Sequence, residues 1–165
     1  MCLNFCMLYF FENDELTECR TCGHSHYKPR IGREKTLIAH KKLRYFPITP
    51  KLKRLFMSPK AAKHMTWHQS HDMVDGVMVN LSIVKLGNTN SAHPHFSVGS
   101  RNMYLGLCTD GLNPFRSFAA PYSCWPIILT VYNLPPRMCM RLEFMFLSMV
   151  ILGPNSPGWN IDVYL

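Results

Sequence analysis

The sequence predicts an α+β fold assembled from parts of different composition. Residues 1–28 hold four of the seven cysteines, and residues 29–75 are basic and carry signals for helix starts. Residues 76–100 form a turn-rich linker, and residues 101–165 contain strand-length apolar runs separated by proline- and glycine-rich turns. A chain of 165 residues with 47% hydrophobic content can bury one core, so we expect an ordered protein.

Four cysteines in the first part have the spacing of a metal-binding knuckle. Cys2, Cys6, Cys19 and Cys22 form the pattern C-x3-C-x12-C-x2-C, with Gly23 directly after the last cysteine. Two thiolate pairs joined by a short loop supply the tetrahedral sulfur ligands that Zn²⁺ prefers, so we predict a zinc-ribbon-like knuckle with structural zinc. Free thiols are the alternative, because Cys2 lies beside a terminus that can fray. The first residues lack the basic stretch of a signal peptide, so we expect a reducing compartment without disulfides.

The basic part predicts two short helices. Thr49 precedes Pro50 and Ser58 precedes Pro59, and Ser or Thr at an N-cap followed by proline is a typical helix start. Apolar residues in each segment then fall on one face, with basic residues elsewhere. The residues expected on the apolar faces are Leu52, Leu55, Phe56, Ala61, Ala62 and Met65.

Positive charge is concentrated in the same part of the chain. Twelve of the eighteen lysines and arginines lie between Lys28 and Lys63, where Glu34 is the single acid. Such a block indicates a polyanionic partner, most commonly nucleic acid, and a solvated helix face is the alternative. The residues expected to contact DNA are Lys41, Lys42, Arg44, Lys51, Lys53, Arg54, Lys60 and Lys63.

Three strands are predicted in the last part, at residues 102–108, 125–132 and 141–152. Residues 77–83 of the linker also alternate like a strand, and residues 159–165 have the pattern of a helix start. No apolar run reaches the roughly 18 residues that span a bilayer, so we expect no membrane partner.

Asp110 follows the strand predicted at residues 102–108. This acid has two interpretations, as a turn residue or as a catalytic carboxylate. Gly111 comes next, and Asp-Gly is a common turn dipeptide, so the local sequence favours a turn. The alternative is the first carboxylate of an RNase H-like nuclease, which gathers several acids around two Mg²⁺ ions. The sequence contains no P-loop, GxSxG, HExxH or dinucleotide fingerprint, which argues against those enzyme classes.

Several segments resemble the plant CACTA (En/Spm-type) transposases, in the order in which that family has them. The paired cysteines of residues 2–28, the basic block of residues 43–68, and the apolar segments 101–115, 122–140 and 153–165 carry the resemblance. The resemblance implies a DDE/D-type nuclease with an RNase H-like core, for which Asp110 is the first catalytic acid. It also implies Mg²⁺ or Mn²⁺ as the catalytic ion, transposon-end DNA as the partner, assembly with other transposase subunits and a nuclear location.

The sequence departs from the family in three respects, one of which is that His26 and Tyr27 stand where the family usually has Arg and Trp. The linker lacks the family's His-Pro-x-Asp and Trp-Lys pattern, and the chain ends at Leu165, before the part that supplies the remaining acids of the family. One carboxylate cannot hold two metal ions, so we expect a catalytically incomplete fragment with residual DNA binding at most. Its sheet would be an incomplete RNase H-like sheet with the first three strands. The alternatives are a subunit of an active transposase completed by another chain, and a non-functional remnant.

Overall fold

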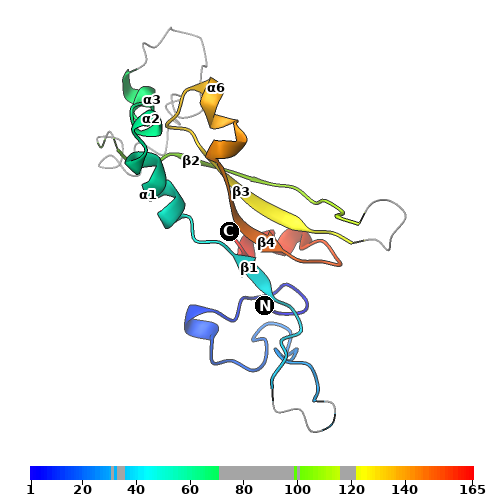
Figure 1. The fold of residues 1–165 in the computed structure, drawn as a ribbon. Coiled ribbons are helices and arrows are strands. Elements are labelled where there is room, and N and C mark those ends of the chain that lie inside the picture. The colour runs from blue at the N-terminus through cyan, green and yellow to red at the C-terminus, as the bar shows by residue number, and fades with distance from the viewer. Residues whose placement is uncertain (31, 33–35, 71–98, 100, 116–121) are drawn as a thin grey trace. The chain divides into compact units, whose positions relative to one another are not determined.

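The computed structural model describes residues 1–30, 32, 36–70, 99, 101–115 and 122–165 (Figure 1). The chain divides into two compact units. Unit 1 comprises Met1–Tyr45, Asp110–Pro126 and Met149–Leu165, and unit 2 comprises Phe46–Thr109 and Ile127–Ser148. The strand-like alternation at residues 77–83 lies outside the described residues.

The described strands form one four-stranded sheet in the order β1-β4-β3-β2. The strands are β1 (Leu43–Tyr45), β2 (Leu105–Thr109), β3 (Trp125–Val131) and β4 (Met145–Ile151). The α+β class and the three strands predicted after residue 101 are therefore confirmed. The sheet has one more strand than expected, because β1 forms within the segment that was predicted to be helical.

Both ends of the sheet are antiparallel pairs. In unit 1, Leu43 lies opposite Ile151 and Tyr45 lies opposite Met149. In unit 2, Leu105 lies opposite Val131 and Thr109 lies opposite Ile127. Beyond β2, an isolated bridge between Leu112 and Cys124 continues the hairpin. The hairpin therefore carries Asp110 at the point where its first strand ends.

The helical segments within the described residues are short. Their bounds are η1 (Phe11–Asn13), α1 (Thr49–Met57), α2 (Pro59–Ala62), α3 (Trp67–Ser70), α6 (Pro136–Cys139), η2 (Leu142–Phe144) and η3 (Gly158–Val163). The helix start predicted at residues 159–165 is the 3-10 helix η3. None of the helices that the structure describes is long and apolar enough to cross a membrane.

Helix α1 begins one residue earlier than predicted. Ile48 is its N-cap and has helical backbone angles, and its carbonyl accepts the amide of Leu52 at 3.0 Å. Thr49 is therefore inside the helix rather than at its cap, and Pro50 still lies in the first turn, where its missing N–H costs no hydrogen bond. Ser58 is the N-cap of α2 as predicted, but its side chain makes no capping hydrogen bond.

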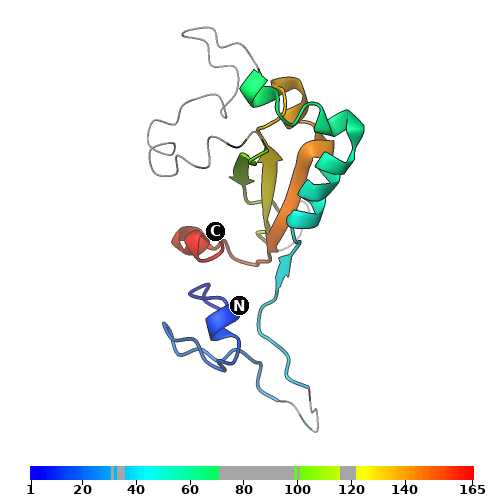
Figure 2. The same ribbon diagram turned by 90° about the vertical axis from the view of Figure 1, so that its left-hand side faces the viewer.

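The core of unit 2 joins α1 and α2 to β3, α6 and β4, and Figures 1 and 2 show the ribbons of these elements. Its buried residues are Leu55, Ala61, Met65, Val131, Leu134 and Cys139, with Leu52, Phe56 and Phe146 packed against them. The apolar helix faces predicted from the sequence are therefore confirmed for residues on both α1 and α2. The segment before β2 is held by Asn133, which is fully buried, accepts the amide of Tyr104 at 2.7 Å and donates to the carbonyl of Asn102 at 2.7 Å.

Candidate functional site

The structure brings Cys2, Cys6, Cys19 and Cys22 together in unit 1. Their Sγ atoms all lie within 4.8 Å of one another, and those of Cys2 and Cys22 are 3.5 Å apart. A tetrahedral zinc ion with Zn–S bonds of about 2.3 Å requires sulfur atoms about 3.8 Å apart. The four thiols are thus arranged closely enough for one zinc ion after small adjustments of their side chains.

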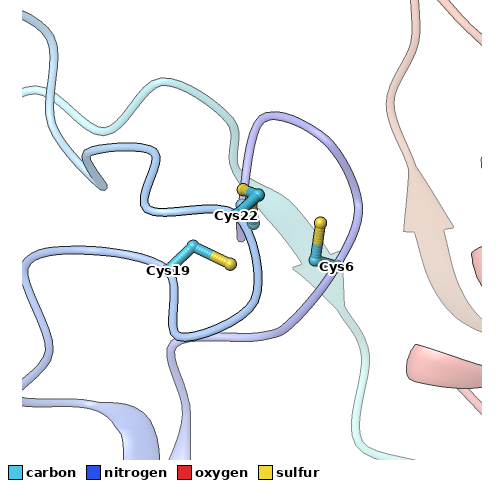
Figure 3. A group of neighbouring side chains, drawn as sticks. Cys6, Cys19 and Cys22 are labelled. Carbon is cyan, nitrogen blue, oxygen red and sulfur yellow. The ribbon is translucent and has the colours of Figure 1, made fainter.

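Two loops present these cysteines, as Figure 3 shows for three of them. The first loop is closed by a hydrogen bond from the amide of Cys2 to the carbonyl of Met7, at 3.0 Å. The second is closed by a bond from the amide of Cys19 to the carbonyl of His24, at 2.9 Å. Gly23 turns the second loop with φ of +68°, a left-handed conformation that favours glycine. The glycine after the last cysteine therefore gives the second loop its tight turn.

Polar groups around the cluster act on the ionisation of its thiols. The backbone N–H of His24, together with the Cys2, Cys19 and Asn4 side chains, lowers the pKa of Cys22 to about 6. Burial, with neighbouring thiols adding to the effect, raises the pKa of Cys6 to about 12, and burial also raises the pKa of Cys2. Four thiolates crowded together in a partly buried site need a cation to balance their charge, and Zn²⁺ supplies it. The donor set therefore fits zinc.

All seven cysteines are free thiols in the structure. Cys108 is exposed, Cys124 is half-buried and Cys139 is buried in the core of unit 2, and none of the three joins the metal-binding group.

Contacts within unit 1 hold the cysteine loops in ways that the spacing does not reveal. Phe5, between the first two cysteines, packs edge-on against the buried Tyr164 at 6.4 Å between ring centroids. The Nζ atom of Lys41 lies 3.3 Å from the centre of the Phe5 ring, and Asn160 donates to the carbonyl of Asn4 at 3.4 Å. Aromatic residues at the two ends of the chain carry no sequence signal for this pairing.

The eight basic residues expected at DNA differ in their surroundings. Lys41 is used in the cation–π contact with Phe5, and burial lowers its pKa. Lys51 donates to the carbonyl of Leu147 at 2.7 Å, so its ammonium is tied to the β4 backbone. The residues with exposed side chains are Lys42, Arg44, Lys53, Arg54, Lys60 and Lys63. Within the described part of the chain, none of these six side chains makes an internal hydrogen bond or cation–π contact that phosphate binding would have to break.

Asp110 lies exposed at the end of β2, and its Oδ1 accepts the backbone N–H of Gly111 at 2.7 Å. Residues 110 and 111 form no turn: the chain runs on to the bridge at Leu112, and a turn follows at residues 114–115. The turn that the Asp-Gly dipeptide predicts therefore does not form at that dipeptide. Among the described residues, the cysteine set is the one group of three or more metal ligands, so the described part of the chain gathers no carboxylate cluster around Asp110. Asp162 is exposed in η3, and it forms no group of metal ligands with Asp110 among the described residues.

Comparison with known families gives one match. Residues 84–165, just under half of the chain, match the family model described as Transposase family tnp2, and this match supports a transposase family for the chain. The matched region contains β2, β3, β4 and Asp110, whereas the cysteine cluster, α1 and α2 precede it. No curated protein and no solved structure matches the sequence significantly.

Proposed function

We propose that this chain is a DNA-binding protein derived from a CACTA (En/Spm-type) transposase and located in the nucleus. The observation that carries the proposal is the transposase-family match over residues 84–165, preceded in the chain by the basic block. Transposases act on DNA, and exposed lysines and arginines bind its backbone by displacing counterions. The contacts proposed are therefore electrostatic and have little sequence selectivity.

Within this proposal the four-cysteine cluster holds a structural zinc ion. Its sulfur geometry, its two hydrogen-bonded loops and the positive φ of Gly23 support a zinc-ribbon-like knuckle. A structural zinc ion would fix the two loops relative to each other and carry no reaction step. Mg²⁺ or Mn²⁺ would enter only where a further set of carboxylates completes a site with Asp110.

The proposal also includes an incomplete RNase H-like sheet. Three consecutive strands lie side by side in the order β4-β3-β2, and the acid lies directly after the strand at the end of this order. This arrangement supports a shared origin with two-metal nucleases. We expect no strand cleavage by this chain alone, since one carboxylate does not bind two metal ions.

DNA binding is tested with a variant in which four exposed cations on α1 and α2 are neutralised. Lys53→Gln, Arg54→Gln, Lys60→Gln and Lys63→Gln are combined, and binding to a fluorescent duplex is measured by anisotropy at several salt concentrations. If all four contact phosphates, the slope of log K against log salt concentration becomes less steep by up to about 3.6. Arg20→Gln and Arg137→Gln, which remove exposed arginines outside the block, are the matched controls. Unchanged affinity and salt dependence in the fourfold variant would remove α1 and α2 from the interface.

A second candidate is a subunit of an active DDE/D transposase whose remaining acids come from another chain. The exposure of Asp110 at the end of an outer strand of the sheet favours it, because a partner could approach the carboxylate there. Its test is Mg²⁺-dependent cleavage of terminal-repeat DNA by the assembled subunits, with Asp110→Asn as the comparison. Cleavage that survives this substitution would remove Asp110 from the mechanism. A chain that is insoluble when purified would instead favour a non-functional remnant.

A further inference from the structure

A cavity in unit 2 lies beside the basic residues of α1 and α2. Its volume is about 300 Å³, and it is lined by Phe56, Ala62, Thr66 and Arg101. Phe56 comes from the end of α1, Ala62 is the last residue of α2, Thr66 precedes α3, and Arg101 precedes β2. Three short helices and the approach to the hairpin therefore meet around one hollow of the size that small ligands occupy.

The lining combines a cation with an apolar wall. The side chain of Arg101 is exposed, and no described residue forms an ion pair or hydrogen bond with its guanidinium. A guanidinium that no described residue engages is well suited to bind phosphate through paired N–H donors. Thr66 adds a hydroxyl group, while the ring of Phe56 and the methyl group of Ala62 supply apolar surface.

Phe56 is half-buried and forms the aromatic part of the cavity lining. It packs against the buried core of unit 2, yet part of the residue remains accessible and lines the cavity. A ring held in this way by the core can present its remaining surface to a flat partner without losing further side-chain freedom. Nucleobases are flat, and they stack on protein aromatic rings with little dependence on base identity.

The charge around the cavity favours an anionic ligand. Lys60 and Lys63 flank Ala62 on the chain, and both are exposed. The described residues of unit 2 contain one acid, Glu143, which is paired with Arg141 at 2.8 Å. A phosphate approaching Arg101 therefore meets little repulsion from the described part of this unit.

We infer that the cavity binds one unpaired nucleotide of a DNA strand, with its base against Phe56 and its phosphate at Arg101. This inference rests on the proposed DNA binding and extends it from the duplex backbone to a single-stranded or unpaired position. A base inside a duplex is stacked and paired, so its face is not available to Phe56. The cavity thus distinguishes unpaired from paired DNA, which the exposed lysines alone do not.

The test compares a single-stranded oligonucleotide with the same sequence as a duplex, using fluorescence anisotropy on the full chain. Arg101→Gln is expected to weaken single-strand binding at least about fivefold. It should also make the slope of log K against log salt concentration less steep by about 0.7. Duplex affinity should stay within about twofold. Arg137→Gln, an exposed arginine in α6, is the matched control and should change neither affinity.

A second arm tests the aromatic wall. An oligonucleotide whose central nucleotides lack bases should bind the wild-type chain at least about fivefold more weakly than the intact strand, because stacking is lost. Phe56→Leu should abolish this difference. Because Phe56 also contacts the core, circular dichroism must show that the fold of Phe56→Leu is unchanged. If the fold does change, Thr66→Val serves as a second variant, since the two side chains have similar volumes. Thr66→Val should weaken binding of the intact single strand and leave duplex binding unchanged.

Different outcomes separate the cavity from the proposed function. Wild-type single-strand affinity in Arg101→Gln, or an equal loss with duplex and single strand, would overturn the nucleotide cavity and leave DNA binding standing. The same holds if the wild-type chain binds duplex but no single strand. If the wild-type chain binds neither form of DNA at low salt, the proposed function fails together with the cavity.

Discussion

Replacing Asn133 by alanine should be among the most destabilising polar substitutions in unit 2. Asn133 is fully buried, and its amide group makes two hydrogen bonds of 2.7 Å to the backbone of Tyr104 and Asn102. These bonds fix the segment between Arg101, which lines the cavity, and the start of β2. The substitution would leave a backbone N–H and a carbonyl without these partners.

The expected loss follows from those two groups. Leaving one buried polar group unsatisfied costs about 1 to 3 kcal/mol, and the half-buried positions of Asn102 and Tyr104 allow water to replace part of each bond. We therefore expect a loss of about 2 to 3 kcal/mol in the free energy of unfolding, out of a total of about 5 to 15 kcal/mol for an ordinary domain.

Urea unfolding followed by circular dichroism measures this loss, and Asn113→Ala is the matched control. Asn113 is exposed and accepts one backbone N–H, that of Phe115, at 3.0 Å, so its replacement should cost less than about 1 kcal/mol. Equal effects of the two substitutions would refute the reasoning, because burial would then have no influence on the cost.

Three further predictions concern the metal, the core and the acid. The purified chain should contain one zinc ion. Cys19→Ser or a chelator should remove this ion and lower the melting temperature, whereas Cys108→Ser should retain it. Wild-type protein that contains no zinc would argue against the site. Met65→Ala, at a fully buried position, should cost about 2 to 5 kcal/mol in urea unfolding, against about 0.5 kcal/mol for the exposed Met57→Ala. Asp110→Asn should change stability by less than about 0.5 kcal/mol, because an amide oxygen can also accept the N–H of Gly111; a larger loss would give the carboxylate a structural role.

Local patterns in the sequence were sufficient to predict much of the fold. The strands after residue 101 follow from apolar runs bounded by turn residues, and the faces of α1 and α2 follow from helical periodicity. The predicted strand at residues 141–152 begins late, at Met145, because residues 142–144 form a 3-10 turn. Strand β1 could not be predicted, since its three residues become a strand by pairing with residues about a hundred positions later.

The candidate site was predictable to a similar extent. Cysteine spacing alone indicated which thiols meet, because ligand pairs in tight loops have a restricted geometry. The packing of Phe5 against Tyr164 depends on residues from the two ends of the chain, which no local pattern connects. Nor does composition distinguish Lys51, tied to a backbone carbonyl, from the exposed Lys53 two residues later. Periodicity and spacing report on neighbours in sequence, whereas these roles depend on neighbours in space.

The central claim, that this chain binds DNA through exposed cations, is tested most directly by the salt dependence of wild-type binding to duplex DNA. Each phosphate contact contributes about −0.9 to the slope of log K against log salt concentration, so six exposed cations set a limit of about −5. We predict a slope between about −3 and about −5 over about 50 to 200 mM salt. A slope near zero, or no binding at the lowest salt concentration, would contradict the claim.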